Sequence, residues 1–502
     1  MLRNNSKNKI IMGIGLSLML VIMGACEEKQ EVTSQGENSG KSYKIELLSD
    51  TPEITYQNGD EITGIGDPYA FTCNGMYYMT ATSNGQLFDL YQSTDMKEWS
   101  YVRKIFQTSY TEGWVKSNLW QPQLIQGTDG KFYLYYCGNN RDNSLRIGVA
   151  VADTVEGPYK DVKNKPLFDL GYATIDPYLY LDEDGSMYLY YSRDCSENVV
   201  DGKNTSQIYV VEMESYTKLK EGSEHRLLLS PEQNWELRSG DWLWNEGPDL
   251  LKHQGKYYLF YSANCYASYD YSIGYAVSDS PLGPFVKYEN NPVISAIGKM
   301  SGTGNNSFFY SLDGKELFTA YHTHTDPVNG GGNRKLTIDR CGFQEDGTFY
   351  ISGPTMARQP EPSGTRTFIK DFAGVSVSSS AEGKDAKSLF DGTISKTLED
   401  ISCEWTTASE DKEQYIVVDF GSQKEIREIV LYPTFRDTSV PQNLQVQLDD
   451  GGIISAIALS TNDSMEPVIL SFEPKATQHV KIILGNEEEP SELGLAEIMF
   501  LE

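Results

Sequence analysis

The chain has 502 residues and a formal net charge of −29, with 71 acidic residues against 42 lysines and arginines. This balance argues against nucleic acid and anionic membrane surfaces as partners and favours a neutral ligand. The length allows two or three domains with cores of their own. Aromatic residues make up 12% of the chain, which suits both a β-rich fold and stacking on sugars.

The N-terminus is predicted to be a bacterial export signal. Basic residues precede an apolar run over residues 10–23, which is too short for a comfortable membrane span of about 20 residues. Small residues then lead into Cys26, as in a lipoprotein signal whose cysteine becomes the acylated N-terminus. An ordinary secretory signal with an incidental cysteine is the alternative. We expect a signal peptide over residues 1–25, a flexible tether over 26–44, and an exported lipoprotein of the outer membrane, the cell surface or the periplasm, attached only by lipid.

One aromatic strand is repeated five times along the chain. The copies are NGMYYMTA from Asn74, GKFYLYYC from Gly130, GSMYLYYS from Gly185, GKYYLFYS from Gly255 and the weaker GKELFTAY from Gly314. Each interval is long enough for one four-stranded sheet, and such a period is typical of a β-propeller. We expect five blades over residues 45–355. A large β-sandwich is the alternative, although sandwiches seldom repeat so regularly.

A second strand precedes each copy and opens with a recurring phrase. The phrases are GDPYAF, WQPQLI, IDPYLY, EGPDLL and NNSFFY. The first strand of a propeller blade lines the central channel, so the residues that open these strands should form a ring at one mouth of the axis. That ring would contain Asp67, Gln121, Asp176, Glu246 and Asn305. Glu246 lies one place before the proline-aligned position, so it should sit at the same level with a different aim.

Three acids at one mouth are costly, because like charges repel and raise each other's pKa. Sites that carry this cost are often functional. Glycoside hydrolysis uses a protonated acid behind the leaving oxygen and an ionised base that activates water. A third carboxylate can hold the pKa of the acid up and orient it. The alternative is that these residues cap strand starts, since Asp-Pro commonly opens turns.

The phrases GDPYAF, WQPQLI, IDPYLY and NEGPDL resemble those of family 43 glycoside hydrolases, and the resemblance covers the whole propeller region. It implies an inverting mechanism that needs no cofactor for the chemistry. Asp67 would be the general base, Asp176 the residue that modulates and orients the acid, and Glu246 the general acid. A neutral plant oligosaccharide or polysaccharide would be the partner.

The remaining predicted substrate-binding residues are Trp120, Gln121, Arg334, Asn305 and His322. Trp120 would stack on sugar, with packing as the alternative. Arg334 follows a glycine-rich loop and resembles the family arginine that reaches sugar hydroxyls, with a solvated surface arginine as the alternative.

The fifth copy departs from the family. SGTGNNSF resembles the family's Gly-x-Gly-His phrase, whose histidine helps to hold a central hydrated cation, but Asn305 stands in the histidine position. An asparagine can still ligate Ca²⁺, and His322 should return to the same mouth, so a structural Ca²⁺ stays open without identified ligands. The cysteines other than Cys26 show no CxxC spacing, so we expect buried free thiols and no metal cluster, with a disulfide between blades as the alternative.

A linker rich in proline and polar residues is predicted over residues 356–369. The short alternating strands beyond it predict a β-sandwich of jelly-roll type over residues 370–502. The run SLFDGT, then Trp405, then QYIVVDFGSQKEIREIVLY resembles the discoidin-like, coagulation-factor C-type domain. That resemblance implies glycan binding, with a structural spacer as the alternative.

The sequence thus predicts an all-β protein, a five-bladed β-propeller followed by a β-sandwich. The leading hypothesis is an exo-acting α-L-arabinofuranosidase that trims plant polysaccharide side chains. β-Xylosidase, endo-arabinanase and exo-galactosidase stay open, because loops at the mouth decide between them. The rival of another class is a non-catalytic, surface-exposed glycan-binding lipoprotein, against which the presence of all three acids argues.

Overall fold

The computed structural model describes residues 42–502, apart from residues 50–54, 60–61, 109–112, 345, 395–403, 461–464 and 486–490. The predicted signal peptide and Cys26 lie outside the described residues. The regular structure that is described consists of strands and short 3-10 turns, so the prediction of an all-β protein is confirmed. Within this part of the chain, no helix is long and apolar enough to cross a bilayer.

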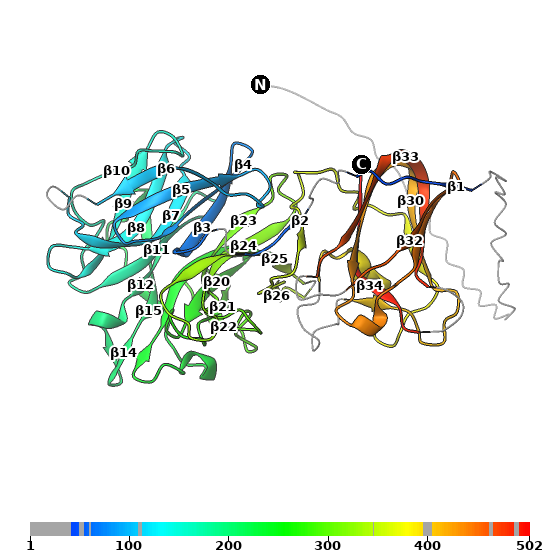
Figure 1. Ribbon diagram of the computed structural model, residues 1–502. Helices are drawn as coiled ribbons and strands as arrows, with labels where there is room; N and C mark the ends of the chain where they lie inside the picture. Colours follow the sequence, from blue (N-terminus) through cyan, green and yellow to red (C-terminus); the bar gives the residue numbers. More distant parts are fainter. Residues whose placement is uncertain are drawn as a thin grey trace, which may run out of the picture. The chain divides into compact units, whose positions relative to one another are not determined.

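Five antiparallel sheets follow one another along the chain (Figure 1). Sheet 1 consists of β3 (Gly66–Cys73), β4 (Met76–Thr82), β5 (Leu87–Ser93) and β6 (Ser100–Gln107). Sheet 2 consists of β7 (Ser117–Gln126), β8 (Phe132–Asn139), β9 (Leu145–Ala152) and β10 (Lys160–Asp161). Sheet 3 consists of β11 (Thr174–Leu181), β12 (Met187–Arg193), β15 (Gln207–Ser215), β16 (Lys218–Leu219) and β17 (Arg226–Leu229). Sheet 4 consists of β19 (Asn245–His253), β20 (Lys256–Ala263), β21 (Ser272–Ser278) and β22 (Val286–Lys287). Sheet 5 consists of β23 (Gly304–Tyr310), β24 (Leu317–His324), β25 (Arg334–Phe343) and β26 (Phe349–Ile351).

The first strands of these sheets form a closed ring. Strand β3 contacts β7, β7 contacts β11, β11 contacts β19, β19 contacts β23, and β23 contacts β3 again. This order is the one found in a propeller, whose innermost strands surround the axis. The ring therefore brings the openings of all five first strands together, although they are far apart in sequence.

One apolar cluster fills each interface between neighbouring sheets. The aromatic repeat supplies both sides of these interfaces, because successive side chains of a strand point to opposite faces. Tyr135 lies in the cluster shared by sheets 2 and 3, and Tyr136 lies in the cluster shared by sheets 1 and 2. Burial of each large apolar side chain stabilises the fold by about 1.5–3 kcal/mol. Tyrosines of the repeat are therefore among the residues that join the sheets.

The ring closes where sheet 5 meets sheet 1. Strand β2 (Thr55–Tyr56) pairs with β27 (Gln359–Pro360), and Thr63 bridges to Lys335. The Gly64 N–H also donates to the carbonyl of Arg334 at 2.9 Å. Backbone hydrogen bonds across this closure take the place of a covalent connection.

A small three-stranded sheet is added between sheets 3 and 4. It consists of β13 (Val199–Val200), β14 (Lys203–Thr205) and β18 (Trp242–Leu243). Strand β18 ends just before β19, so this added sheet lies directly beside the opening of sheet 4.

The C-terminal region forms an eight-stranded sheet around a core of its own. Its strands are β1 (Tyr43–Lys44), β28 (Gly374–Val377), β29 (Trp405–Thr406), β30 (Tyr415–Pro433), β31 (Leu444–Leu448), β32 (Gly452–Ile457), β33 (Val468–Ile483) and β34 (Gly494–Leu501). Strand β1 pairs with β32, and Ile45 is buried in the C-terminal core. The propeller was predicted to begin at residue 45, but this residue belongs to the C-terminal core. A two-residue strand carries no periodic signal from which the sequence could have indicated this.

Candidate active site

The residues that open the first strands share an unusual backbone conformation. Asp67, Gln121, Asp176 and Asn305 have φ angles of 51, 50, 54 and 54°, and Gly247 has a φ of 60°. Each lies at a register shift in the first hairpin of its sheet. Left-handed backbone is strained for most L-residues, and such strain gathers at functional sites. In sheet 4 a glycine takes this position, and the acid comes one residue earlier, with the offset that the sequence predicts.

Polar residues that end the aromatic repeat bind these strained openings. The Gln121 N–H donates to Oγ1 of Thr82 at 2.9 Å, and the Asn305 N–H donates to Oγ of Ser262 at 2.7 Å. Each contact joins the second strand of one sheet to the first strand of the next. The polar end of the repeat is therefore an inter-sheet connection that positions the ring residues.

The same connection closes the ring through His322. The Asp67 N–H donates to Nδ1 of His322 at 3.1 Å. The pKa of His322 lies well below its usual range, because of burial first and then the nearby charge of Arg334. A neutral imidazole can accept at Nδ1, as this hydrogen bond requires. His322 thus returns to the mouth beside Asp67.

The Asp67 carboxylate is held on one oxygen. Oδ1 accepts from Nη1 of Arg334 at 2.9 Å and from Nδ2 of Asn305 at 3.0 Å. The Arg334 guanidinium reaches this position because residue 66 is glycine: a Cβ on Gly66 would lie 1.9 Å from Cζ of Arg334. The ring of Tyr266 lies 4.9 Å from the same Cζ, and this tyrosine is 45% exposed.

Asp176 lies between sheets 3 and 4. Its Oδ2 accepts from the Gly247 N–H at 2.9 Å and from Oγ of Ser192 at 3.3 Å. Burial, and then the negative charge of Asp67, raise the pKa of Asp176 to about 8. Ser192 therefore does not bind the next strand directly, as Thr82 and Ser262 do. The Asp176 carboxylate lies between Ser192 and Gly247, the residue that follows Glu246, and accepts from both.

Glu246 is buried, and its carboxyl favours the protonated form. Its pKa is raised well above the usual range by burial and then by the charge of Asp176, with a smaller contribution from Asp67. The hydroxyl of Tyr271 donates to Oε1 at 3.0 Å, which acts in the opposite direction. The structure therefore brings all three predicted carboxylates into mutual electrostatic contact.

Tyr271 and Ser192 were not predicted from the sequence. Ser192 ends the third aromatic repeat, so alignment of the repeat ends could have found it. Tyr271 precedes β21 and belongs to no motif. It reaches Glu246 because residue 304 is glycine: a Cβ on Gly304 would lie 1.9 Å from Cε1 of Tyr271.

Trp120 and Gln121, both predicted to bind substrate, have different surroundings. Trp120 is half-buried and packs against the cluster between sheets 2 and 3. The Gln121 side chain is in the ring, and its Oε1 finds no hydrogen-bond partner among the described residues; the same holds for Oδ1 of Asn305.

A metal centre finds little support in this ring. The described residues contain no group of three or more His, Cys, Asp or Glu that could hold a metal ion. The two unpartnered amide oxygens are neutral and suit water as well as a cation. Cys73, Cys137, Cys195, Cys265 and Cys341 are free thiols.

A closed ring of five sheets with three neighbouring carboxylates, one of them paired with an arginine, suits the hydrolysis of a glycosidic bond. The profile of the glycosyl hydrolases family 43 matches residues 63–349, and the chain belongs to this family. The protein is a glycoside hydrolase, and like its family it inverts configuration and needs no cofactor for catalysis. Residues 369–501 match a domain of unknown function, DUF7402, so the discoidin-like assignment stays a prediction.

Solved and curated proteins agree with this family. A thermostable family-43 glycoside hydrolase is 44% identical and matches with a TM-score of 0.59 over 62% of this chain and 100% of that chain. An endo-1,4-beta-xylanase from Bacteroides thetaiotaomicron is 31% identical, with a TM-score of 0.52 over 60% and 98%. The beta-D-galactofuranosidase xynD of Aspergillus niger is 27% identical over 318 residues, 60% of this chain and 86% of that protein. An extracellular endo-alpha-(1->5)-L-arabinanase of Thermotoga petrophila is 23% identical, over 59% and 73%.

Proposed function

We propose that the protein removes α-L-arabinofuranosyl side chains from plant polysaccharides, with Glu246 as general acid, Asp67 as general base and Asp176 as the residue that maintains the proton on the acid. The five sheets would be the five blades of the family propeller. The observation that carries the proposal is the buried, proton-favouring carboxyl of Glu246 in the same ring as a carboxylate that is paired with an arginine.

The environment of Asp67 suits a base. Both of its close donors, Arg334 and Asn305, bind Oδ1, which leaves Oδ2 to orient a water and take its proton. The contact with the guanidinium fixes the carboxylate in one orientation. The Nε of Arg334 has no partner in the described part of the chain, and a hydroxyl of the bound sugar would satisfy it.

The environment of Glu246 suits an acid. A general acid must carry a proton at the working pH, and burial together with the charge of Asp176 favours that state. Tyr271 orients the carboxyl through Oε1. After proton transfer to the leaving oxygen, the new carboxylate keeps this hydrogen bond, so the product state is not left unpaired.

The choice of an arabinofuranoside rests on relatives. An arabinoxylan arabinofuranohydrolase of Paenibacillus polymyxa is 26% identical over 338 residues. The Aspergillus niger galactofuranosidase favours a second candidate, a β-D-galactofuranosidase. The two sugars share the configuration of the five-membered ring and differ at the exocyclic carbons, a difference that pocket loops discriminate. β-Xylosidase and endo-arabinanase activities belong in the same test.

The test is hydrolysis of nitrophenyl α-L-arabinofuranoside, β-D-galactofuranoside, β-D-xyloside and galactopyranoside, together with plant polysaccharides, by the wild type, Asp67→Ala and Glu246→Ala. Tyr310→Ala is the matched control, because Tyr310 is 51% exposed at the far end of β23. We expect turnover of the arabinofuranoside with inversion at the anomeric carbon, which NMR follows directly. A wild type that cleaves none of these glycans would overturn the proposal.

Glu246→Ala separates the acid from the base. A nitrophenolate leaves without a proton, so this variant should retain more activity on nitrophenyl substrates than on natural glycans. Asp67→Ala should lose activity on both. Equal losses for Glu246→Ala on the two kinds of substrate would contradict its assignment as the acid.

Export and the C-terminal region complete the proposal. We propose a lipid anchor on Cys26. The wild type should then fractionate with membranes, and the Cys26→Ser variant should appear in the soluble fraction. The extracellular arabinanase relatives of Thermotoga petrophila and Bacillus subtilis support export. We propose that the C-terminal sheet is a sandwich that binds glycan. A pull-down on insoluble arabinan that compares the intact protein with a variant truncated after residue 369 would test this.

A further inference from the structure

The chain is extended just before Glu246. The carbonyl of Leu243 accepts from the Ser206 N–H at 2.8 Å, and the Asn245 N–H donates to the carbonyl of Ser206 at 3.1 Å. Leu243 and Asn245, two positions apart, both form backbone hydrogen bonds to Ser206, as neighbouring strands of a sheet do. The strand therefore runs from β18 into β19 without a break in its alternation.

Alternation gives this strand two different faces. Leu243 and Asn245 are buried, at 6% and 0% exposure. Trp242 is 44% exposed, and Trp244 is partly exposed. Because successive side chains point to opposite faces, Trp242, Trp244 and Glu246 project from the same face. Two indoles thus precede the acid in a row.

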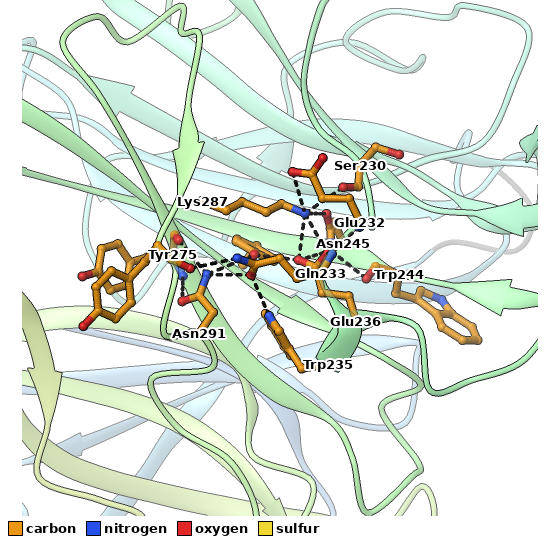
Figure 2. A network of polar contacts seen from close by, with 12 residues as sticks. Ser230, Glu232, Gln233, Trp235, Glu236, Trp244, Asn245, Tyr275, Lys287 and Asn291 are labelled. Atoms are coloured by element: carbon orange, nitrogen blue, oxygen red, sulfur yellow. Dashed lines mark hydrogen bonds and ion pairs between the residues drawn. The ribbon is translucent and has the colours of Figure 1, made fainter.

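A buried polar network holds the opposite face. Nζ of Lys287 donates to Oδ1 of Asn245 at 3.0 Å and forms an ion pair with Glu236 at 2.8 Å. The Lys287 and Glu236 side chains are 4% and 0% exposed, and Nδ2 of Asn245 donates to the Glu236 carboxylate at 3.4 Å. Figure 2 shows Asn245 within this network, with the indole of Trp244 pointing away from it. Removing either partner would leave a buried charge unpaired, so the orientation of the strand is strongly held.

The two indoles lie nearly parallel to each other and together form an apolar patch. Their ring centroids are 6.4 Å apart, with an interplanar angle of 23°. Trp242 belongs to the small added sheet, whose strand β13 also presents Val199 at 67% exposure. Exposed aromatic surface next to a catalytic group indicates a ligand, and a flat indole suits the apolar face of a neutral sugar ring.

We propose that Trp242 and Trp244 form the binding surface for the sugar that leaves with the polysaccharide chain. This inference rests on the proposed role of Glu246 as the acid. A general acid lies beside the leaving oxygen, so an aromatic surface on the same face of the same strand contacts the leaving group rather than the sugar held by Asp67. The ligand would be a neutral polysaccharide main chain that carries the side chain to be cut, which makes the enzyme a debranching one.

The test compares a polymer with a substrate that lacks the main chain. The measured quantity is the ratio of kcat/KM on branched arabinan or arabinoxylan to kcat/KM on the nitrophenyl glycoside that the wild type cleaves. We expect Trp242→Ala to lower this ratio about tenfold, as loss of an aromatic anchor commonly does, and Trp242→Phe to restore part of it. Tyr101→Ala, an exposed tyrosine on the outer strand β6 at 59% exposure, should leave the ratio unchanged.

The outcomes separate the two proposals. A wild type without activity on any glycan refutes the proposed function. An active wild type whose ratio is the same in Trp242→Ala, through equal losses or through none, refutes the binding surface while the catalytic assignment stands. Trp244→Ala should move the ratio in the same direction as Trp242→Ala. Because Trp244 is the more buried of the two, thermal unfolding should check that the Trp244→Ala variant is folded. If that variant is unstable, the result for Trp242→Ala alone decides the test.

Discussion

Replacement of Tyr271 by phenylalanine isolates the hydrogen bond that opposes protonation of Glu246. The Tyr271 hydroxyl donates to Oε1 at 3.0 Å and favours the ionised carboxylate. Hydrogen bonds to charged groups contribute about 1.5–3 kcal/mol, against about 0.5–1.5 kcal/mol for neutral pairs. The two ranges differ by about 1–1.5 kcal/mol, which corresponds to about one pKa unit. Removal of the hydroxyl should therefore raise the Glu246 pKa by about one unit.

The sign of the activity change follows from the role of the acid. In the proposed mechanism, catalysis requires protonated Glu246 and is lost as the pH rises through its pKa, so the alkaline limb of the kcat/KM profile should move up by about one pH unit. Because Asp176 and Glu246 interact, the pKa measured from the alkaline limb belongs to the two carboxyls together. The assay is kcat/KM on the natural glycan over the neutral and alkaline range, with Tyr310→Phe as control. A limb that stays in place, or moves down, would refute the assignment of Glu246 as the acid that Tyr271 contacts.

Three other changes test the same site. Asp176→Asn removes a charge that raises the Glu246 pKa, so the alkaline limb should move down, and an upward shift would contradict the coupling. Glu246→Gln should raise Tm at alkaline pH but not at acid pH, because a carboxyl with a raised folded pKa contributes stability below its unfolded pKa and loses it as the pH rises through the folded one; a gain independent of pH in calorimetry would count against this. Gly66→Ala puts a Cβ 1.9 Å from Cζ of Arg334 and should displace the guanidinium from Asp67, with a fall in kcat/KM and a loss of about 1–3 kcal/mol of stability; unchanged kinetics would show that the pairing is dispensable.

The ring could be predicted because its determinants are local. The aromatic repeat marks the second strand of each sheet, and the phrase upstream marks the strained opening of the first. Asp67, Asp176 and Glu246 follow from these two patterns together, including the offset of the glutamate that Gly247 explains. The repeat ends carried further information, since Thr82 and Ser262 bind the openings of the next sheets.

Other parts of the site depend on contacts between distant segments. Tyr271 reaches Glu246 through a gap that Gly304 leaves, and no spacing in the sequence indicates that gap. Trp120 packs against core residues between sheets 2 and 3, which is the alternative that the sequence left open, and its stacking on sugar stays a prediction. Strand β1 has two residues and pairs with β32, so no periodicity could have assigned residues 43–48 to the C-terminal sheet.

The closure of the ring has a consequence for when the enzyme becomes active. Asp67 opens the first sheet, yet its N–H is bound by His322 and its carboxylate by Arg334, both from the last sheet. A chain that has folded only its first four sheets already contains Asp176 and Glu246 but lacks the groups that orient Asp67, the proposed base. On the proposed mechanism, hydrolysis therefore requires the final sheet to join the first, because only then are both partners of Asp67 in place.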